Sequence, residues 1–131
     1  MSARFPTLLR WYLGVLMVGL LLQGGVSLVF RLAPALAASA PYLVRGVFGI
    51  DFWHAWIHIL WGGVGSAIVA AGRRQAQVRL ALAFGLFYTV LGVAGVAVHH
   101  PLGLQLDWFE NGFHLVAGPA TLLLGAVEAS A

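Results

Sequence analysis

Four long apolar stretches, separated by shorter polar segments, run through this chain of 131 residues. They lie at about 11–30, 52–71, 80–98 and 108–127. A helix of roughly 20 apolar residues is long enough to cross the hydrocarbon core of a bilayer. The pattern therefore predicts an all-α protein, with one integral membrane domain over residues 1–131 that folds as a bundle of four transmembrane helices.

The connection at 31–50 is the longest of the predicted polar segments. Its Ala/Leu-rich middle predicts a short helix lying in the membrane interface. A second interpretation takes the N-terminal region as a secretory signal, cleaved near Ala38-Ser39-Ala40. The length of the apolar stretch, and the ten residues between Phe30 and Ala40, favour a membrane span.

The composition agrees with a membrane protein. Apolar residues make up 61% of the chain and charged residues only 8%, whereas a soluble domain carries about 25% charged residues. The absence of cysteine excludes disulfides and thiolate metal sites. The net charge of +3 comes from arginines scattered at the ends of the apolar stretches. Because they form no patch, we expect no nucleic-acid partner.

The arginines predict the orientation in the membrane. The N-terminal segment and the basic loop expected at 72–79 hold Arg4, Arg10, Arg73, Arg74 and Arg79, and the other two connections hold only Arg31 and Arg45. Positive charge concentrates on the cytoplasmic side of membrane proteins. We therefore expect a multi-pass protein of a bacterial inner membrane, with both termini in the cytoplasm and residues 31–51 and 99–107 outside.

A short motif occurs twice, 56 residues apart. It consists of an aspartate, a histidine and a glycine at matching positions, namely Asp51, His58 and Gly62, then Asp107, His114 and Gly118. The first and third stretches align at Gly25 and Gly92. The chain therefore reads as two repeated helical hairpins, at about 8–72 and 78–128, related by a parallel pseudo-twofold axis along the membrane normal.

Ionisable side chains are concentrated in the predicted outer half. It holds all five histidines and three of the four carboxylates, and such groups are costly within a membrane span. His58 and His114 each lie seven residues after their aspartate, about 10 Å along the helix. If the second and fourth helices pack side by side, the two imidazoles lie at the same depth.

Two kinds of bound group fit this pattern. A haem b could be ligated by His58 and His114, with Gly62 and Gly118 making room beside the flat ring. A single transition-metal ion could instead be bound by His54, His58, Glu110 and His114, a set of imidazoles and one carboxylate that suits zinc, iron or copper. A third possibility is a proton or quinone site that uses the same side chains.

A purely structural interpretation stays open beside these. The histidines would then hydrogen-bond a neighbouring helix or water. Asp51 and Asp107 would only cap helices, with Glu110 completing a capping box after Asp107. The glycines would only allow close contact between membrane helices.

The four-span layout, with His58-x-x-x-Gly62 and His114-x-x-x-Gly118 after acidic caps, resembles a group of small four-helix bacterial integral membrane proteins with no assigned activity. The resemblance implies the architecture and no mechanism. No phosphate-binding loop, Gly-x-Ser-x-Gly elbow or His-Glu-x-x-His motif is present. We expect a non-enzymatic accessory subunit of a larger membrane complex, which associates with other subunits or with itself. The alternatives are a redox or proton- and quinone-handling enzyme subunit, and an oligomeric transporter.

Overall fold

The computed structural model describes residues 8–131, and these residues form helices and no strand. The long helices are α1 (Leu8–Leu32), α4 (Phe52–Ala71), α5 (Arg74–Ala97) and α6 (Trp108–Ser130). Shorter elements are α2 (Pro34–Ser39), α3 (Pro41–Arg45) and the 3₁₀ turn η1 (Pro101–Gly103). The all-α class is confirmed, and each of the four long helices is long and apolar enough to cross a membrane. Arg4, which contributes to the predicted orientation, lies outside the described residues.

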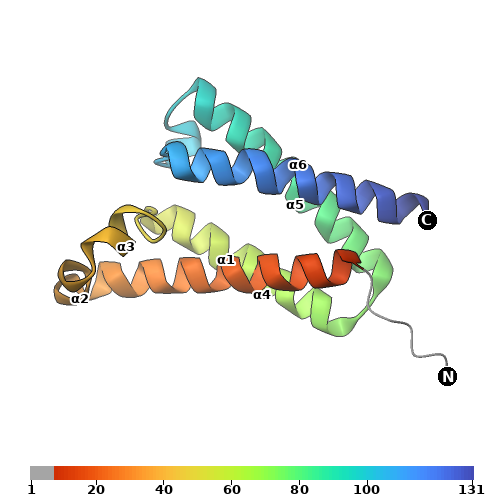
Figure 1. The fold of residues 1–131 in the computed structure, drawn as a ribbon, viewed down its shortest axis with the longest axis horizontal. Coiled ribbons are helices and arrows are strands. Elements are labelled where there is room, and N and C mark those ends of the chain that lie inside the picture. Colours follow the sequence, from red (N-terminus) through yellow and green to blue (C-terminus); the bar gives the residue numbers. More distant parts are fainter. Residues whose placement is uncertain (1–7) are drawn as a thin grey trace.

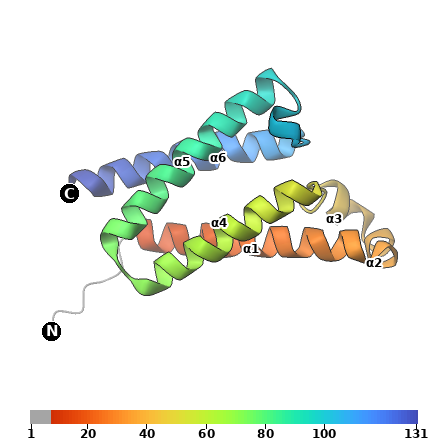
Figure 2. The same cartoon turned by 180° about the vertical axis from the view of Figure 1, so that it is seen from behind.

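The long helices form two antiparallel hairpins that lie next to each other (Figures 1 and 2). The first hairpin is α1 with α4, and the second is α5 with α6; each pair packs along much of its length. One end of the molecule, which we call the arginine end, carries the start of α1, the α4–α5 turn and the C-terminus (Figure 1). The opposite end, the histidine end, carries the α1–α4 and α5–α6 connections.

The arginine end differs from the sequence prediction in one respect. The basic loop expected at 72–79 is reduced to Gly72 and Arg73, and α5 begins at Arg74 rather than near residue 80. Gly72 adopts a left-handed conformation, with φ of 70°, which ends α4 and turns the chain. The Arg, Gln and Ala residues that follow are good helix formers, so they extend α5 towards the turn.

The α1–α4 connection, at the histidine end, contains two short helices, whereas the sequence predicted one. Both α2 and α3 begin at a proline, which is favoured in the first turn of a helix. The segment after α3 is fixed to α1: Arg31 donates to the carbonyl oxygen of Ile50 through Nε at 3.1 Å and Nη2 at 2.9 Å. Gln23 donates to the carbonyl oxygen of Val47 at 2.8 Å. These bonds position the start of α4.

Glycines allow close backbone contact within each hairpin. A Cβ atom added to Gly62 would lie 2.5 Å from the backbone nitrogen of Leu21, and one added to Gly118 would lie 2.5 Å from that of Thr89. Added to Gly24 or Gly92, it would lie 3.1 Å from the Cβ of the histidine opposite, His58 or His114 respectively. Gly24 thus contacts His58 in the way that Gly92 contacts His114, whereas the sequence analysis aligned Gly25 with Gly92. A Cβ on Gly25 would have no neighbour within 4 Å.

Replacing Gly85 with alanine is expected to destabilise the second hairpin. The new Cβ would lie 2.5 Å from the backbone nitrogen of Leu122, so α5 and α6 must move apart, at a cost of about 1–3 kcal/mol. Thermal unfolding in detergent measures the effect. Gly19→Ala is the matched control, because a Cβ there has no neighbour within 4 Å and alanine favours the helix. Equal melting temperatures for the two variants would contradict the expectation.

The two hairpins also contact each other, mainly through aromatic and polar side chains. Trp61 of α4 packs edge-on against Phe84 of α5, with ring centroids 5.4 Å apart. At the histidine end, Asp51 accepts a hydrogen bond from the backbone of Gln105 at 3.0 Å. Towards the arginine end, the hydroxyl groups of Tyr12 and Thr121 lie 2.9 Å apart. The candidate site lies between these two polar contacts along the helices.

Candidate metal centre

Three histidines meet where α4 of the first hairpin faces α6 of the second. The ring centroid of His54 lies 4.5 Å from the ring centroid of His58 and 5.4 Å from that of His114. The ring centroids of His58 and His114 lie 6.3 Å apart. One ring nitrogen from each residue falls in a group whose members all lie within 4.8 Å of one another. All three side chains are at most 1% exposed. We call these residues the three-histidine group.

The two capped helix starts determine the depth of these histidines. Asp51 caps α4 by accepting a hydrogen bond from the backbone nitrogen of His54 at 2.9 Å. Asp107 caps α6 by accepting from the backbone nitrogens of Phe109 and Glu110, and Glu110 accepts in return from the backbone of Asp107 at 3.2 Å. The predicted capping box is thereby confirmed. Because both helices begin at the same end, His58 and His114 enter the interior to a similar depth.

The cap at α6 also affects the charge of Asp107, which precedes the helix. Partial burial alone would raise the pKa of its carboxyl group. Hydrogen bonds from Glu110 and from the backbone of Phe109 outweigh that effect and hold the pKa below its ordinary value. The carboxylate is thus the favoured form at neutral pH, and it places a negative charge at the histidine end.

The ring nitrogens of the three-histidine group have no hydrogen-bond partner among residues 8–131. A neutral imidazole carries one N–H donor and one acceptor nitrogen. Leaving a buried polar group unpaired costs about 1–3 kcal/mol, and six such atoms lie together here. Each ring contributes one lone pair, so the three-histidine group can offer three nitrogen ligands to a metal ion.

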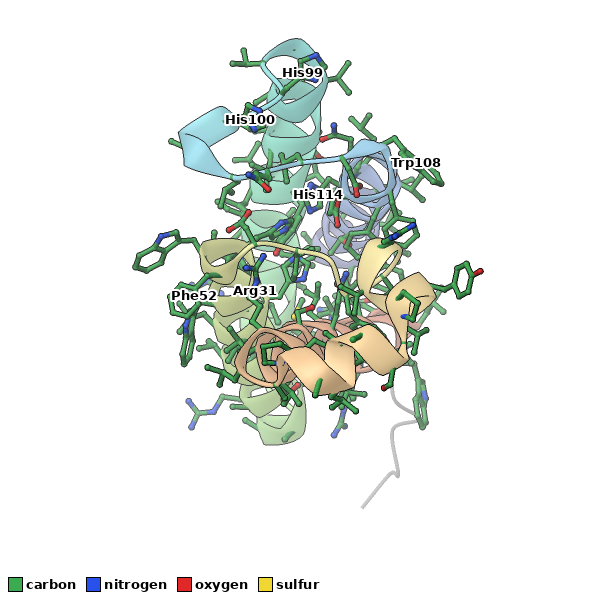
Figure 3. All side chains as sticks on the ribbon, turned by 90° about the vertical axis from the view of Figure 1, so that its left-hand side faces the viewer. Arg31, Phe52, His99, His100, Trp108 and His114 are labelled. Atoms are coloured by element: carbon green, nitrogen blue, oxygen red, sulfur yellow. The ribbon has the colours of Figure 1, made fainter. Side chains whose placement is uncertain are left out.

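Glu110 is not part of this group, although the sequence placed it in the same ligand set. It is 4% exposed, holds the backbone of Asp107 and lines a separate cavity of about 390 Å³ at the histidine end. His99, His100 and Asp107 line the same cavity. Figure 3 looks onto this end, with His99 and His100 near the end of α5 and His114 in the interior. The structure thus gathers three of the four predicted metal ligands.

Tyr88 is a member of the site that the sequence analysis did not identify. Its ring centroid lies 4.9 Å from that of His114 and 5.9 Å from that of His58. Its hydroxyl group is buried and has no hydrogen-bond partner within residues 8–131. The available signal was a single tyrosine in the long apolar stretch at 80–98.

The surroundings of the histidines favour an ion over a haem. Gly62 faces α1 and Gly118 faces α5, so both glycines contact a helix of their own hairpin rather than the space between His58 and His114. His54 and Tyr88 pack against both of those rings. A macrocycle between the two imidazoles would have to displace these side chains.

Three neutral imidazoles form a ligand set with a clear chemical preference. Imidazole suits zinc, copper, iron and nickel, whereas magnesium and calcium prefer oxygen ligands. Three protein ligands leave a fourth position open in a tetrahedral site.

No protein family, curated protein or solved structure matches this chain.

Proposed function

We propose that this chain is a four-helix integral protein of a bacterial inner membrane that binds one transition-metal ion on His54, His58 and His114. In this proposal the protein is a non-enzymatic component of a larger membrane assembly. The four long apolar helices support insertion in a bilayer.

The observation that carries the proposal is the burial of three imidazoles with every ring nitrogen unpaired. Around a tetrahedral zinc ion, with bonds of about 2.0 Å, ligand nitrogens lie about 3.3 Å apart. The nitrogens of the group lie within 4.8 Å of one another, so rotation of the rings with small shifts of α4 and α6 completes the coordination. Tyr88, whose ring packs against those of His58 and His114, is our candidate for the fourth position, which water fills otherwise.

The cavity at the histidine end supplies an approach for the ion. His99, His100 and Asp107 line its walls, and Glu110 lies one helical turn from His114 on the same face of α6. Carboxylates and imidazoles attract a hydrated cation and exchange its water molecules. Glu110 in this proposal passes the ion to the three-histidine group rather than holding it permanently.

The duplication of the hairpin and the membrane orientation belong to the same proposal. Matching glycine contacts support the duplication: Gly24 against His58 corresponds to Gly92 against His114. The orientation follows from the positive-inside rule, which puts the arginine end in the cytoplasm. The ion-binding site then lies towards the outer face of the membrane.

Metal analysis of the protein, purified in mild detergent and dialysed against Zn²⁺ or Co²⁺, tests the proposal. We expect one ion per chain, and visible absorption bands in the cobalt form because three nitrogen ligands impose a low coordination number. His99→Ala is the control, since this residue lines the cavity but is not in the three-histidine group. A protein that takes up neither ion would leave the purely structural interpretation, and a Soret band would establish a haem instead.

A further inference from the structure

A cleft opens between the two hairpins near the arginine end. Its volume is about 550 Å³, and its walls come from α4, the α4–α5 turn and α5. Trp61, Val64 and Ile68 lie at intervals of three and four residues and so share one face of α4. Ala83 lines the opposite wall from α5. This apolar wall extends for about 10 Å along α4 from Trp61 to Ile68, enough to accommodate the upper part of an acyl chain.

Two arginines line the same cleft closer to the turn. Arg73 lies in the turn itself and Arg79 lies in the second turn of α5, and both side chains are exposed. Neither guanidinium group has a hydrogen bond or ion pair among residues 8–131. The cleft therefore has two uncompensated positive charges at one end and an apolar wall at the other.

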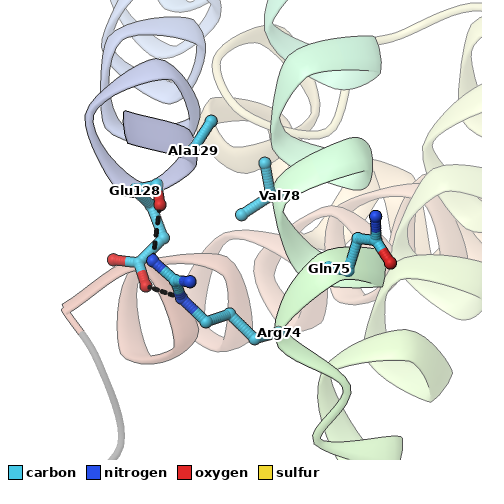
Figure 4. Close-up of a pocket in the computed structure, with 5 residues that line it drawn as sticks. All are labelled: Arg74, Gln75, Val78, Glu128 and Ala129. Carbon is cyan, nitrogen blue, oxygen red and sulfur yellow. Dashed lines mark hydrogen bonds and ion pairs between the residues drawn. The ribbon is translucent and has the colours of Figure 1, made fainter. Parts of the chain in front are cut away.

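The neighbouring Arg74 shows the contrasting arrangement. Its Nε donates to the carboxylate of Glu128 at 2.7 Å, and its Nη2 donates to the backbone oxygen of Glu128 at 2.6 Å (Figure 4). This ion pair lies in a different pocket, between α5 and α6. The chain thus neutralises Arg74 internally and leaves Arg73 and Arg79 available to an external anion.

We propose that this cleft binds one anionic phospholipid, with its phosphate between Arg73 and Arg79 and an acyl chain along Trp61, Ile68 and Ala83. A guanidinium group binds phosphate oxygens in a bidentate manner. Basic pockets between membrane helices recognise anionic headgroups, and each arginine near the membrane surface adds to the attraction. A zwitterionic lipid offers the same acyl chain but carries its own cation. The cleft therefore distinguishes lipids by headgroup charge, independently of the metal site.

Native mass spectrometry of the detergent-solubilised chain, mixed with equal amounts of phosphatidylglycerol and phosphatidylcholine, tests this site. We expect one phosphatidylglycerol molecule to be retained per chain in preference to phosphatidylcholine. The double variant Arg73→Gln/Arg79→Gln should lower the affinity for phosphatidylglycerol about thirtyfold. Arg45→Gln, which removes one charge from an exposed position on α3 at the opposite end, should leave the occupancy unchanged.

A second variant tests the apolar part of the cleft with the charges intact. Ala83 is exposed, so Ala83→Trp fills the wall without disturbing the helix core and should also displace phosphatidylglycerol. Circular dichroism and metal uptake of all variants should match the wild type, which excludes misfolding as the cause. Equal retention of the two lipids, equal retention by the double variant, or displacement of phosphatidylglycerol by an excess of inorganic phosphate would each overturn the proposal.

Discussion

Replacing His114 with alanine is expected to weaken metal binding by at least about 100-fold, because loss of a direct ligand costs more than loss of the groups that orient it. His114 is the single member of the three-histidine group on α6. Its removal leaves two imidazoles on one helix, and two ligands hold a transition-metal ion weakly. Competition titration with a chromophoric zinc chelator measures the change in Kd.

Two further variants separate ligation from packing. His114→Gln keeps a polar side chain of similar size, so it preserves most of the packing and should still lose the ion. Tyr88→Phe removes only the buried hydroxyl group, and it should lower the affinity if Tyr88 fills the fourth position. Retention of one tightly bound ion per chain in both His114 variants would show that the three-histidine group is not the site.

Asp51→Ala is expected to lower the melting temperature by more than any other single change at a helix cap. Asp51 accepts a hydrogen bond from the backbone of His54, which caps α4, and another from the backbone of Gln105, in the connection that leads to α6. Loss of the cap costs about 1 kcal/mol, and loss of the second bond to a charged group about as much again. For a chain of this size the sum corresponds to a shift of roughly 5–10 °C, measured by thermal unfolding in detergent.

Asp107→Ala is the matched control for this prediction. Asp107 caps α6 in the corresponding place, and its hydrogen bonds run to the first turn of that helix and not to the first hairpin. Its replacement should therefore cost about half as much as that of Asp51. Equal losses of stability in the two variants would contradict the expected extra contribution of the bond between Asp51 and Gln105.

The all-α class and the positions of the long helices could be predicted from the sequence, because long apolar stretches and capping residues are local signals. The prediction placed the second helix at 52–71, the bounds that the structure gives to α4. The start of α5 was misplaced because hydropathy falls at Arg74 and Arg79, whereas helix propensity does not. Hydropathy and helix propensity give different helix ends wherever a helix continues beyond its apolar stretch.

The residues of the candidate site could be predicted only in part, because the rotation of each helix about its axis decides which side chains face the site. The spacing of four residues put His54 and His58 on one face, and the repeat matched His58 to His114. The same repeat matches His54 to Glu110, yet Glu110 lines the cavity at the histidine end. Tyr88 enters the site through the packing of α5 against α4 and α6. No pattern within one helix predicts such a contact between helices.

The division of the three-histidine group between the hairpins has a consequence for biosynthesis. Each hairpin has its own close glycine contacts, so in the proposed membrane protein each hairpin can insert as a unit during synthesis. His54 and His58 arrive with the first hairpin, and His114 lies on the last helix to be synthesised. A partly made chain therefore contains only two of the three histidines of the group. If the group binds an ion as we propose, tight capture of that ion follows only after both hairpins have been synthesised and have associated.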